Sequence, residues 1–491
     1  MHYRVISSIL GIFLLILSFF LLAFYFIALL VYPEESQAYA FLVSFLVTIG
    51  SGLLLYLLPG KFSEDDVTFR EGFVVVGIGW IIIALYGALP FILSGDIPRI
   101  ADAYFESMSG FTTTGASILT EIEDLGKTVL LWRSFTHWLG GMGFIVLSLA
   151  ILPALGVGGM QLYIAEVPGP NPEKLVPRVG QTARILYMVY IIMTVAQVIA
   201  LRLAGMNMFE SLCHTFGSMG TGGFSPLNAS IGQYQAQGIS NAFMFEMIII
   251  IFMFLAGANF SLHYKAFKGN WRVYFQDPEF KFYTFIILFS VVSIGIDLFR
   301  FSVYNSWGEI FRHSSFTVVS IITSTGYATE DFDRWPVSSQ LFLVILMFIG
   351  ASAGSTGGGI KILRIMTLFK QAIVELKHVI HPKRVYVIRF GKMYISREVL
   401  ASMNMFVLLY MIFYVAAVLI LSSTGYDMAT ISTMVVSCFS NIGPGLAKVG
   451  PAHNYGFLPD YAKWILSYMM VLGRLEILPI IVLSLPGTWT K

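Results

Sequence analysis

Charged residues are scarce in this chain of 491 residues, and their scarcity excludes most classes of soluble protein. Only 12% of the residues are Asp, Glu, Lys or Arg, whereas 57% are hydrophobic. Because soluble domains carry about 25% charged residues, we expect the chain to lie in a lipid bilayer. The formal net charge of +2 is too small to indicate nucleic acid as a partner.

Cysteine is almost absent, and this excludes a disulfide framework and a cysteine-ligated metal site. Cys213 and Cys438 each lie in apolar sequence, where we expect buried thiols. His137, His214 and His313 have no carboxylate at metal-ligand spacing, so packing in the core is the favoured interpretation. The sequence shows no nucleophile–base pattern and no nucleotide fingerprint. We therefore predict that the chain is not an enzyme and binds no cofactor of its own.

Long apolar runs are abundant instead. A spanning helix needs about 20 apolar residues, and ten runs approach or exceed this length. The first run is too long for a signal peptide and is followed by no small-residue cleavage site, so we expect a retained helix. The runs cover residues 6–31, 40–58, 73–93, 129–152, 185–203, 243–260, 282–298, 340–366, 399–421 and 462–485.

Shorter, half-apolar segments lie between many of these runs, and four of them end in a similar phrase. They are too short to cross a bilayer and too apolar for ordinary loops, so we expect re-entrant segments. The phrases are Thr113-Thr114-Gly115, Gly220-Thr221-Gly222, Ser324-Thr325-Gly326 and Asn441-Ile442-Gly443. A second marker follows each one in the next run: Leu139-Gly140-Gly141, Leu255-Ala256-Gly257, Ile349-Gly350-Ala351 and Leu472-Gly473-Arg474. Two markers in the same order, four times over, indicate an internal repeat.

The predicted fold is an all-α polytopic membrane protein, in which an N-terminal helical hairpin precedes four pseudo-symmetric helix–pore loop–helix repeats around one central pore. We expect the hairpin at residues 1–70 and the repeats at 71–160, 161–275, 276–397 and 398–491. The third repeat would include an intramembrane gate loop and a basic cytoplasmic linker.

Basic residues indicate the orientation. With the N-terminus inside, cytoplasmic connections contain Lys174, Arg178, Arg184, Lys265, Lys268 and Arg272, as the positive-inside rule requires. The densest basic cluster, at residues 361–397, also falls on this side and includes Lys361 and Arg364. Both termini would then be cytoplasmic. The re-entrant loops would face outward, beside acidic residues that raise the local cation concentration or are simply solvated loop residues. These are Asp96, Asp102, Glu121, Glu123, Asp124, Glu330, Asp331 and Asp333.

The four phrases have a composition that suits a monovalent cation. Such an ion needs oxygen ligands, and backbone carbonyls around an axis supply them without fixed charge. Glycine tolerates positive φ and lets consecutive carbonyls turn to one side, while Thr and Ser hydroxyls hold neighbouring backbone groups. Each preceding short helix would also direct its negative C-terminal end at the ion. The alternative interpretation is that the phrases are Gly/Ser helix-packing motifs.

The four repeats, each with one such glycine, resemble the Trk/Ktr/HKT superfamily of potassium transporters over essentially the whole chain. The two additional N-terminal helices and the phrase Gly473-Arg474-Leu475-Glu476 are most similar to its bacterial TrkH branch. The resemblance implies potassium uptake across a bacterial inner (plasma) membrane. It implies a potassium-binding filter made of Thr113, Thr114, Gly115, Gly220, Thr221, Gly222, Ser324, Thr325, Gly326, Asn441, Ile442 and Gly443. The fourth phrase lacks threonine, so we expect an asymmetric filter.

The same resemblance implies partners. It predicts a homodimer that carries a cytoplasmic ring of TrkA-like nucleotide-binding subunits, with the nucleotide (ATP/ADP or NAD) on that partner. Potassium would be the transported substrate and the only metal ion at the site.

Arg474 lies near the middle of the last run, where a charge costs roughly 2.5–3.5 kcal/mol. It should therefore face the protein interior or water. The resemblance implies an electrostatic barrier beneath the filter, and a static interhelical ion pair is the alternative.

A glycine-rich segment interrupts the long run at residues 340–366. It is not a phosphate-binding loop, because Gly359 is followed by Ile360 and only then by Lys361. The resemblance implies a movable gate below the filter, and close helix packing through small residues is the alternative. The gate residues would be Gly350, Ser352, Gly354, Ser355, Thr356, Gly357, Gly358 and Gly359, together with Arg474.

Two other functions remain open at this point. A secondary transporter that couples potassium to protons or sodium would also contain broken helices. A membrane receptor or scaffold could use the basic cytoplasmic surface.

Overall fold

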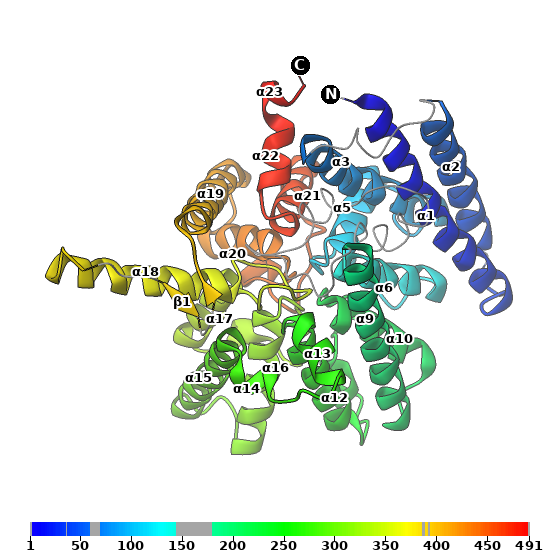
Figure 1. Cartoon of the computed structure of the whole chain (residues 1–491). Helices are drawn as coiled ribbons and strands as arrows, with labels where there is room; N and C mark the ends of the chain where they lie inside the picture. Colours follow the sequence, from blue (N-terminus) through cyan, green and yellow to red (C-terminus); the bar gives the residue numbers. More distant parts are fainter. Residues whose placement is uncertain are drawn as a thin grey trace.

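The helices follow one another around a common centre in chain order, from blue at the N-terminus to red at the C-terminus (Figure 1). The computed structural model describes residues 2–35, 37–58, 69–143, 179–384, 388–390 and 393–489. These residues are predominantly helical. Two short strands, β1 (Arg389–Phe390) and β2 (Met393–Tyr394), pair antiparallel. The prediction of an all-α membrane fold is therefore confirmed, with this small hairpin as an addition.

Six helices in the described part of the chain are long and apolar enough to cross a bilayer. Their apolar length explains why they form in lipid, where every backbone group must be satisfied within the segment. They are α1 (Tyr3–Leu30), α2 (Ala38–Leu57), α3 (Phe69–Gly87) continued by α4 (Leu89–Ser94), α9 (Val179–Leu203), α15 (Pro278–Arg300) and α19 (Arg397–Leu421). Helices α1 and α2 pack closely, since a Cβ added at Gly11 would lie 2.8 Å from the Gly52 carbonyl oxygen. They form the predicted N-terminal hairpin.

A short helix inserts between the two longer helices of each repeat. These pore helices are α5 (Ile100–Phe111), α10 (Met208–Gly220), α16 (Trp307–Ile322) and α20 (Met428–Phe439). Three of them begin at a side-chain cap, because Asn207, Ser306 and Asp427 each accept the N–H of the residue three positions on. The second longer helix of each repeat follows its pore helix. In the four repeats these helices are α6 (Lys127–Gly141), α12 (Ala242–Ala256), α17 (Val337–Ile349) and α21 (Asp460–Arg474).

These second helices end at the glycine markers, earlier than the apolar runs predicted. The chain continues after α12 in α13 (Phe260–Phe267), after α17 in α18 (Ile362–Ile380) and after α21 in α22 (Leu478–Ser484). Helix α13 is bent by 101° from α12. The prediction of continuous spans at 243–260 and 462–485 is therefore wrong, whereas the break within 340–366 was predicted. The end of the run 129–152 and the boundary at residue 160 lie outside the described residues.

Two of the marker glycines allow a close approach of backbones. A Cβ at Gly140 would collide with the Phe111 carbonyl oxygen, and one at Gly473 would collide with the Phe439 carbonyl oxygen. The second helices of the first and fourth repeats thus meet the end of their pore helix at backbone contact distance. The predicted residue boundaries of the repeats stay predictions.

Helix α18 projects from the other helices (Figure 1), but its first turn is packed inside the protein. Lys361 and Arg364 are only 2% and 5% exposed. Lys361 donates to the Gly357 carbonyl and Arg364 pairs with Glu476. The cytoplasmic position of the basic cluster stays a prediction. The remaining short helices are α11 (Gly232–Ala236), α14 (Val273–Gln276) and α23 (Pro486–Trp489).

Candidate functional site

All four pore helices end in the same backbone turn. The first turn residue has φ between 54° and 56°, and a glycine two residues later has φ between 77° and 99°. The N–H of the residue between them donates to the carbonyl five residues back, at 2.8–2.9 Å. Non-glycine residues rarely adopt positive φ, so their presence here marks a strained turn that the surrounding protein maintains. The turns are Thr113-Thr114-Gly115, Thr221-Gly222-Gly223, Ser324-Thr325-Gly326 and Asn441-Ile442-Gly443.

The turn of the second repeat is shifted by one residue from the predicted phrase. Gly220 is the last residue of α10, and Gly223, not Gly222, has the positive φ of the other three glycines. Gly223 lies outside the predicted phrase because that phrase aligns the Thr-Gly dipeptides of the repeats. The available signal was the consecutive pair Gly222-Gly223, which lets the turn begin one residue later.

The four turns close into a ring. A Cβ added at Gly115 would collide with the Gly222 carbonyl oxygen, and additions at Gly223 and Gly326 would collide with the carbonyl oxygens of Thr325 and Ile442. The ring closes at Gly443, where an added Cβ would lie 2.8 Å from the Thr114 carbonyl oxygen. Each turn glycine thus lies against a carbonyl of the next repeat. Backbone oxygens from all four repeats are therefore brought close together, which is the ligand type that a desolvated monovalent cation requires.

The fourth turn differs from the others in its side-chain contacts. Thr114 and Thr325 exchange hydroxyl hydrogen bonds of 2.8 Å with the threonines two residues before them. Ile442 has no hydroxyl, and instead Asn441 Nδ2 donates to Thr114 Oγ1 at 2.9 Å and to the Met470 carbonyl at 3.0 Å. The amide thus connects the fourth repeat to the first.

The three histidines contact aromatic or hydroxyl groups. His137 Nδ1 lies 2.8 Å from the Gly110 carbonyl oxygen, and its ring stacks on Phe224 with a centroid distance of 4.0 Å. His214 Nε2 lies 3.0 Å from Tyr234 Oη, and His313 Nδ1 lies 3.2 Å from Thr329 Oγ1. No cluster of metal-ligating side chains occurs among the residues that the structure describes. These contacts agree with the packing interpretation.

A cavity of about 120 Å³ opens next to the ring, and all four turn glycines line it. None of its described lining residues is acidic, and Arg133 is its one lining arginine. Glu330 and Asp331 line a separate pocket of about 630 Å³, where burial raises the pKa of the Glu330 carboxyl.

The acidic residues at this side of the protein mostly bind other protein groups. Lys463 Nζ donates to Asp102 at 2.5 Å, and Asn228 contacts both Glu121 and Glu123. Several of these acids are thus bound to protein groups, and their effect on the local cation concentration stays a prediction.

The glycine-rich segment contacts the third and fourth turns near their first residues, at the end away from the turn glycines. The Gly358 N–H donates to Ser324 Oγ at 2.6 Å, and a Cβ at Gly357 would lie 2.7 Å from the Thr323 carbonyl oxygen. A Cβ at Gly358 would collide with the Ser440 carbonyl oxygen. Only glycine allows the segment to lie this close to the third and fourth pore helices.

Arg474 connects this segment to the first repeat. Its guanidinium donates to the carbonyls of Thr356 and Gly141 at 2.7 Å each and to Thr113 Oγ1 at 3.2 Å, and it also contacts the Gly140 carbonyl. Arg474 is 8% exposed. The predicted gate residues and the predicted barrier residue are therefore brought together beside the turns that end the pore helices.

Further contacts hold the two ends of the segment. Ala353 N–H donates to Glu279 Oε1 at 2.7 Å, and Ser352 N–H donates to the Gly257 carbonyl at 3.0 Å. Ser355 Oγ donates to the Ser352 carbonyl at 2.6 Å. The segment is thus attached to the second repeat at one end and, through the Arg364–Glu476 ion pair, to the last repeat at the other.

Comparisons with known proteins agree with this architecture. The profile of the TrkH family of cation transport proteins matches residues 38–486. The chain is 38% identical over 495 residues to the Trk system potassium uptake protein TrkH of Salmonella typhimurium, with 100% of both chains covered. It is 38% identical over 494 residues to the TrkH protein of Halomonas elongata, again with 100% of both covered. The crystal structure of the potassium transporter TrkH from Vibrio parahaemolyticus superposes with a TM-score of 0.88 at 34% identity over 100% of both chains. The chain belongs to the TrkH family of cation transport proteins.

Proposed function

We propose that this chain takes up potassium across a bacterial inner membrane through the ring formed by its four turns. The closed ring of backbone carbonyls carries the proposal, because it supplies oxygen ligands from every repeat without fixed charge. The names of the relatives, which are potassium uptake proteins, support potassium as the ion. The filter would comprise the twelve residues predicted from the sequence, with Gly223 added as the turn glycine of the second repeat.

The proposed gate is the segment from residue 350 to 359, held beside the filter by Arg474. The carbonyl contacts of Arg474 support this proposal, because they hold a positive charge beside the ring of turns, where it would oppose cation passage. The proposal includes cytoplasmic termini, a homodimer and a TrkA-like nucleotide-binding ring as the regulator. Its support is the family membership of the chain and the Trk system named in the relatives.

The direct test is uptake of radioactive rubidium into liposomes that contain the purified protein. We expect uptake that potassium competes for more strongly than sodium, and that continues when no proton or sodium gradient is imposed. Uptake that requires one of those gradients would support the secondary transporter instead. Failure to move any cation would contradict the proposal and favour a receptor or scaffold.

Replacing Arg474 with alanine is expected to raise rubidium flux several-fold, since the change removes a repulsive charge from the path. The matched control is Arg474→Lys, which keeps the charge but cannot make all four contacts of the guanidinium. A charge barrier predicts low flux in the lysine variant. If alanine instead lowers both the flux and the yield of folded protein, Arg474 is a structural anchor.

A further inference from the structure

We infer that the buried Glu106–Arg133 ion pair positions the filter and thereby sets its discrimination between cations. The inference rests on the proposed function, because it assigns the pair to the same ion path. Glu106 lies on pore helix α5 and Arg133 on α6, and the two side chains are 0% and 2% exposed. Arg133 Nε donates to Glu106 Oε1 at 2.6 Å.

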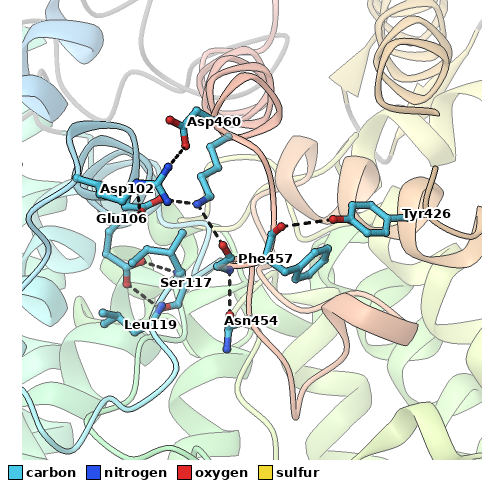
Figure 2. A network of polar contacts seen from close by, with 12 residues as sticks. Asp102, Glu106, Ser117, Leu119, Tyr426, Asn454, Phe457 and Asp460 are labelled. Carbon is cyan, nitrogen blue, oxygen red and sulfur yellow. Dashed lines mark hydrogen bonds and ion pairs between the residues drawn. The ribbon is translucent and has the colours of Figure 1, made fainter. Parts of the chain in front are cut away.

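The carboxylate of Glu106 holds the chain that leaves the first turn. Ser117 Oγ donates to Glu106 Oε1 at 2.9 Å, and the Ile118 N–H donates to Oε2 at 2.9 Å. Figure 2 shows Glu106 beside Ser117, joined by a dashed line. Ser117 is only two residues beyond Gly115, so this carboxylate restrains the segment directly next to the ring.

The guanidinium of Arg133 makes the corresponding contact in the second repeat. Its Nη1 donates to the Ser225 carbonyl at 3.1 Å, and its central carbon lies 3.5 Å from the centroid of the Phe224 ring. Ser225 follows Gly223 by two residues, as Ser117 follows Gly115. One ion pair thus connects the residues that lie two positions after the turn glycine in the first and second repeats.

This connection has a consequence for selectivity. The arrangement of carbonyl oxygens around an ion affects how well they replace its water, so a shift of one turn relative to the next changes this arrangement. A pair whose two charges are buried is costly to disturb, because removal of one partner leaves the other uncompensated. The pair therefore keeps the first two turns at a fixed separation.

A second ion pair provides a control, although only its carboxylate is fully buried and the Arg312 side chain is 16% exposed. Glu246 on α12 is 0% exposed and binds Arg312 on α16 through two hydrogen bonds of 2.5 and 2.6 Å. In the part of the chain that the structure describes, Arg312 also lies over Phe243, and neither partner has a hydrogen bond to a filter turn. Its disruption should therefore cost stability without displacing the ring.

The experiment compares Arg133→Gln, Glu106→Gln and the control Arg312→Gln as full-length proteins in liposomes. Rubidium uptake is competed with potassium or sodium, and only protein that elutes as a single folded species is used. We expect both Arg133→Gln and Glu106→Gln to lower the potassium-to-sodium ratio at least threefold. These two substitutions change the local charge in opposite directions. A loss of discrimination in both would therefore come from displaced turns and not from a changed electrostatic field at the filter. Arg312→Gln should keep the wild-type ratio.

Several outcomes would overturn the inference. They are an unchanged ratio in both Gln variants, opposite shifts in the two, or an equal loss in Arg312→Gln. Where a Gln variant does not fold, Ser117→Ala decides, because it removes one contact of Glu106 and should lower the ratio to a smaller extent; an unchanged ratio there contradicts the inference. Wild-type protein that moves no cation would instead contradict the proposed function itself.

Discussion

Gly223→Ser is expected to remove most of the discrimination between potassium and sodium. Gly223 has a φ of 77°, and a Cβ there would collide with the carbonyl oxygen of Thr325 in the next repeat. A side chain at left-handed φ costs about 1–2 kcal/mol. The turn can relieve the collision only by moving the Thr325 carbonyl. Because about 1.4 kcal/mol of relative binding is a tenfold change in ratio, we expect the selectivity ratio to fall roughly tenfold in competition flux.

Gly238→Ala is the matched control for this substitution. Gly238 also has a positive φ, of 71°, but no heavy atom lies within 4 Å of an added Cβ. The control thus carries the backbone strain without the collision, and its ratio should equal that of the wild type. An unchanged ratio in Gly223→Ser would show that the turns are not the selectivity filter.

Deletion of residues 354–359 is expected to raise basal flux by a large factor and to abolish the response to the nucleotide of the partner ring. The deletion removes the Thr356 carbonyl that Arg474 binds and the Gly358 N–H that contacts Ser324. A gate works as a shift between two states, and a regulator can change the open fraction only as far as it binds the two states differently. Without the segment there is no second state for the partner to favour.

The deletion carries its own control, since the four filter turns stay intact. Sodium discrimination should therefore remain near the wild-type value while the flux rises. If nucleotide-dependent flux persists after the deletion, the segment is a packing motif and the gate lies elsewhere. Loss of discrimination together with higher flux would show that the segment supports the filter as well as closing it.

The repeat architecture could be predicted because its signals are local and recur. Positive φ favours glycine, and a glycine near the end of each short helix revealed the turns at Gly115, Gly326 and Gly443. The second repeat was misaligned by one residue because Gly222 satisfies an x-Thr-Gly pattern and Gly223 a Thr-x-Gly pattern. The positive φ of Gly223 and the backbone hydrogen bond from Gly222 to Gly217 distinguish the two registers.

Features that depend on contacts between distant segments could not be predicted. Hydropathy treats residues 462–485 as one run, whereas α21 ends at Arg474 and is followed by Glu476 and Ile477 at positive φ. The pairing of Glu106 with Arg133 also joins two helices, and each residue taken alone resembled an ordinary charge in a loop or helix. The burial of Lys361 was missed for the same reason, since a positive charge next to a basic cluster suggests solvent until its carbonyl partner is known.

All four turns of the ring belong to a single polypeptide, and this determines how the pore responds to mutation. In a pore made of four identical subunits, every substitution appears four times and changes the whole circumference at once. Here a substitution changes one quarter, so the other three turns still supply their oxygens. The middle position of the turn is occupied by Thr114, Gly222, Thr325 and Ile442 in the four repeats. In the proposed filter, the groups around the ion can therefore be changed one quarter at a time while the other three turns stay as they are.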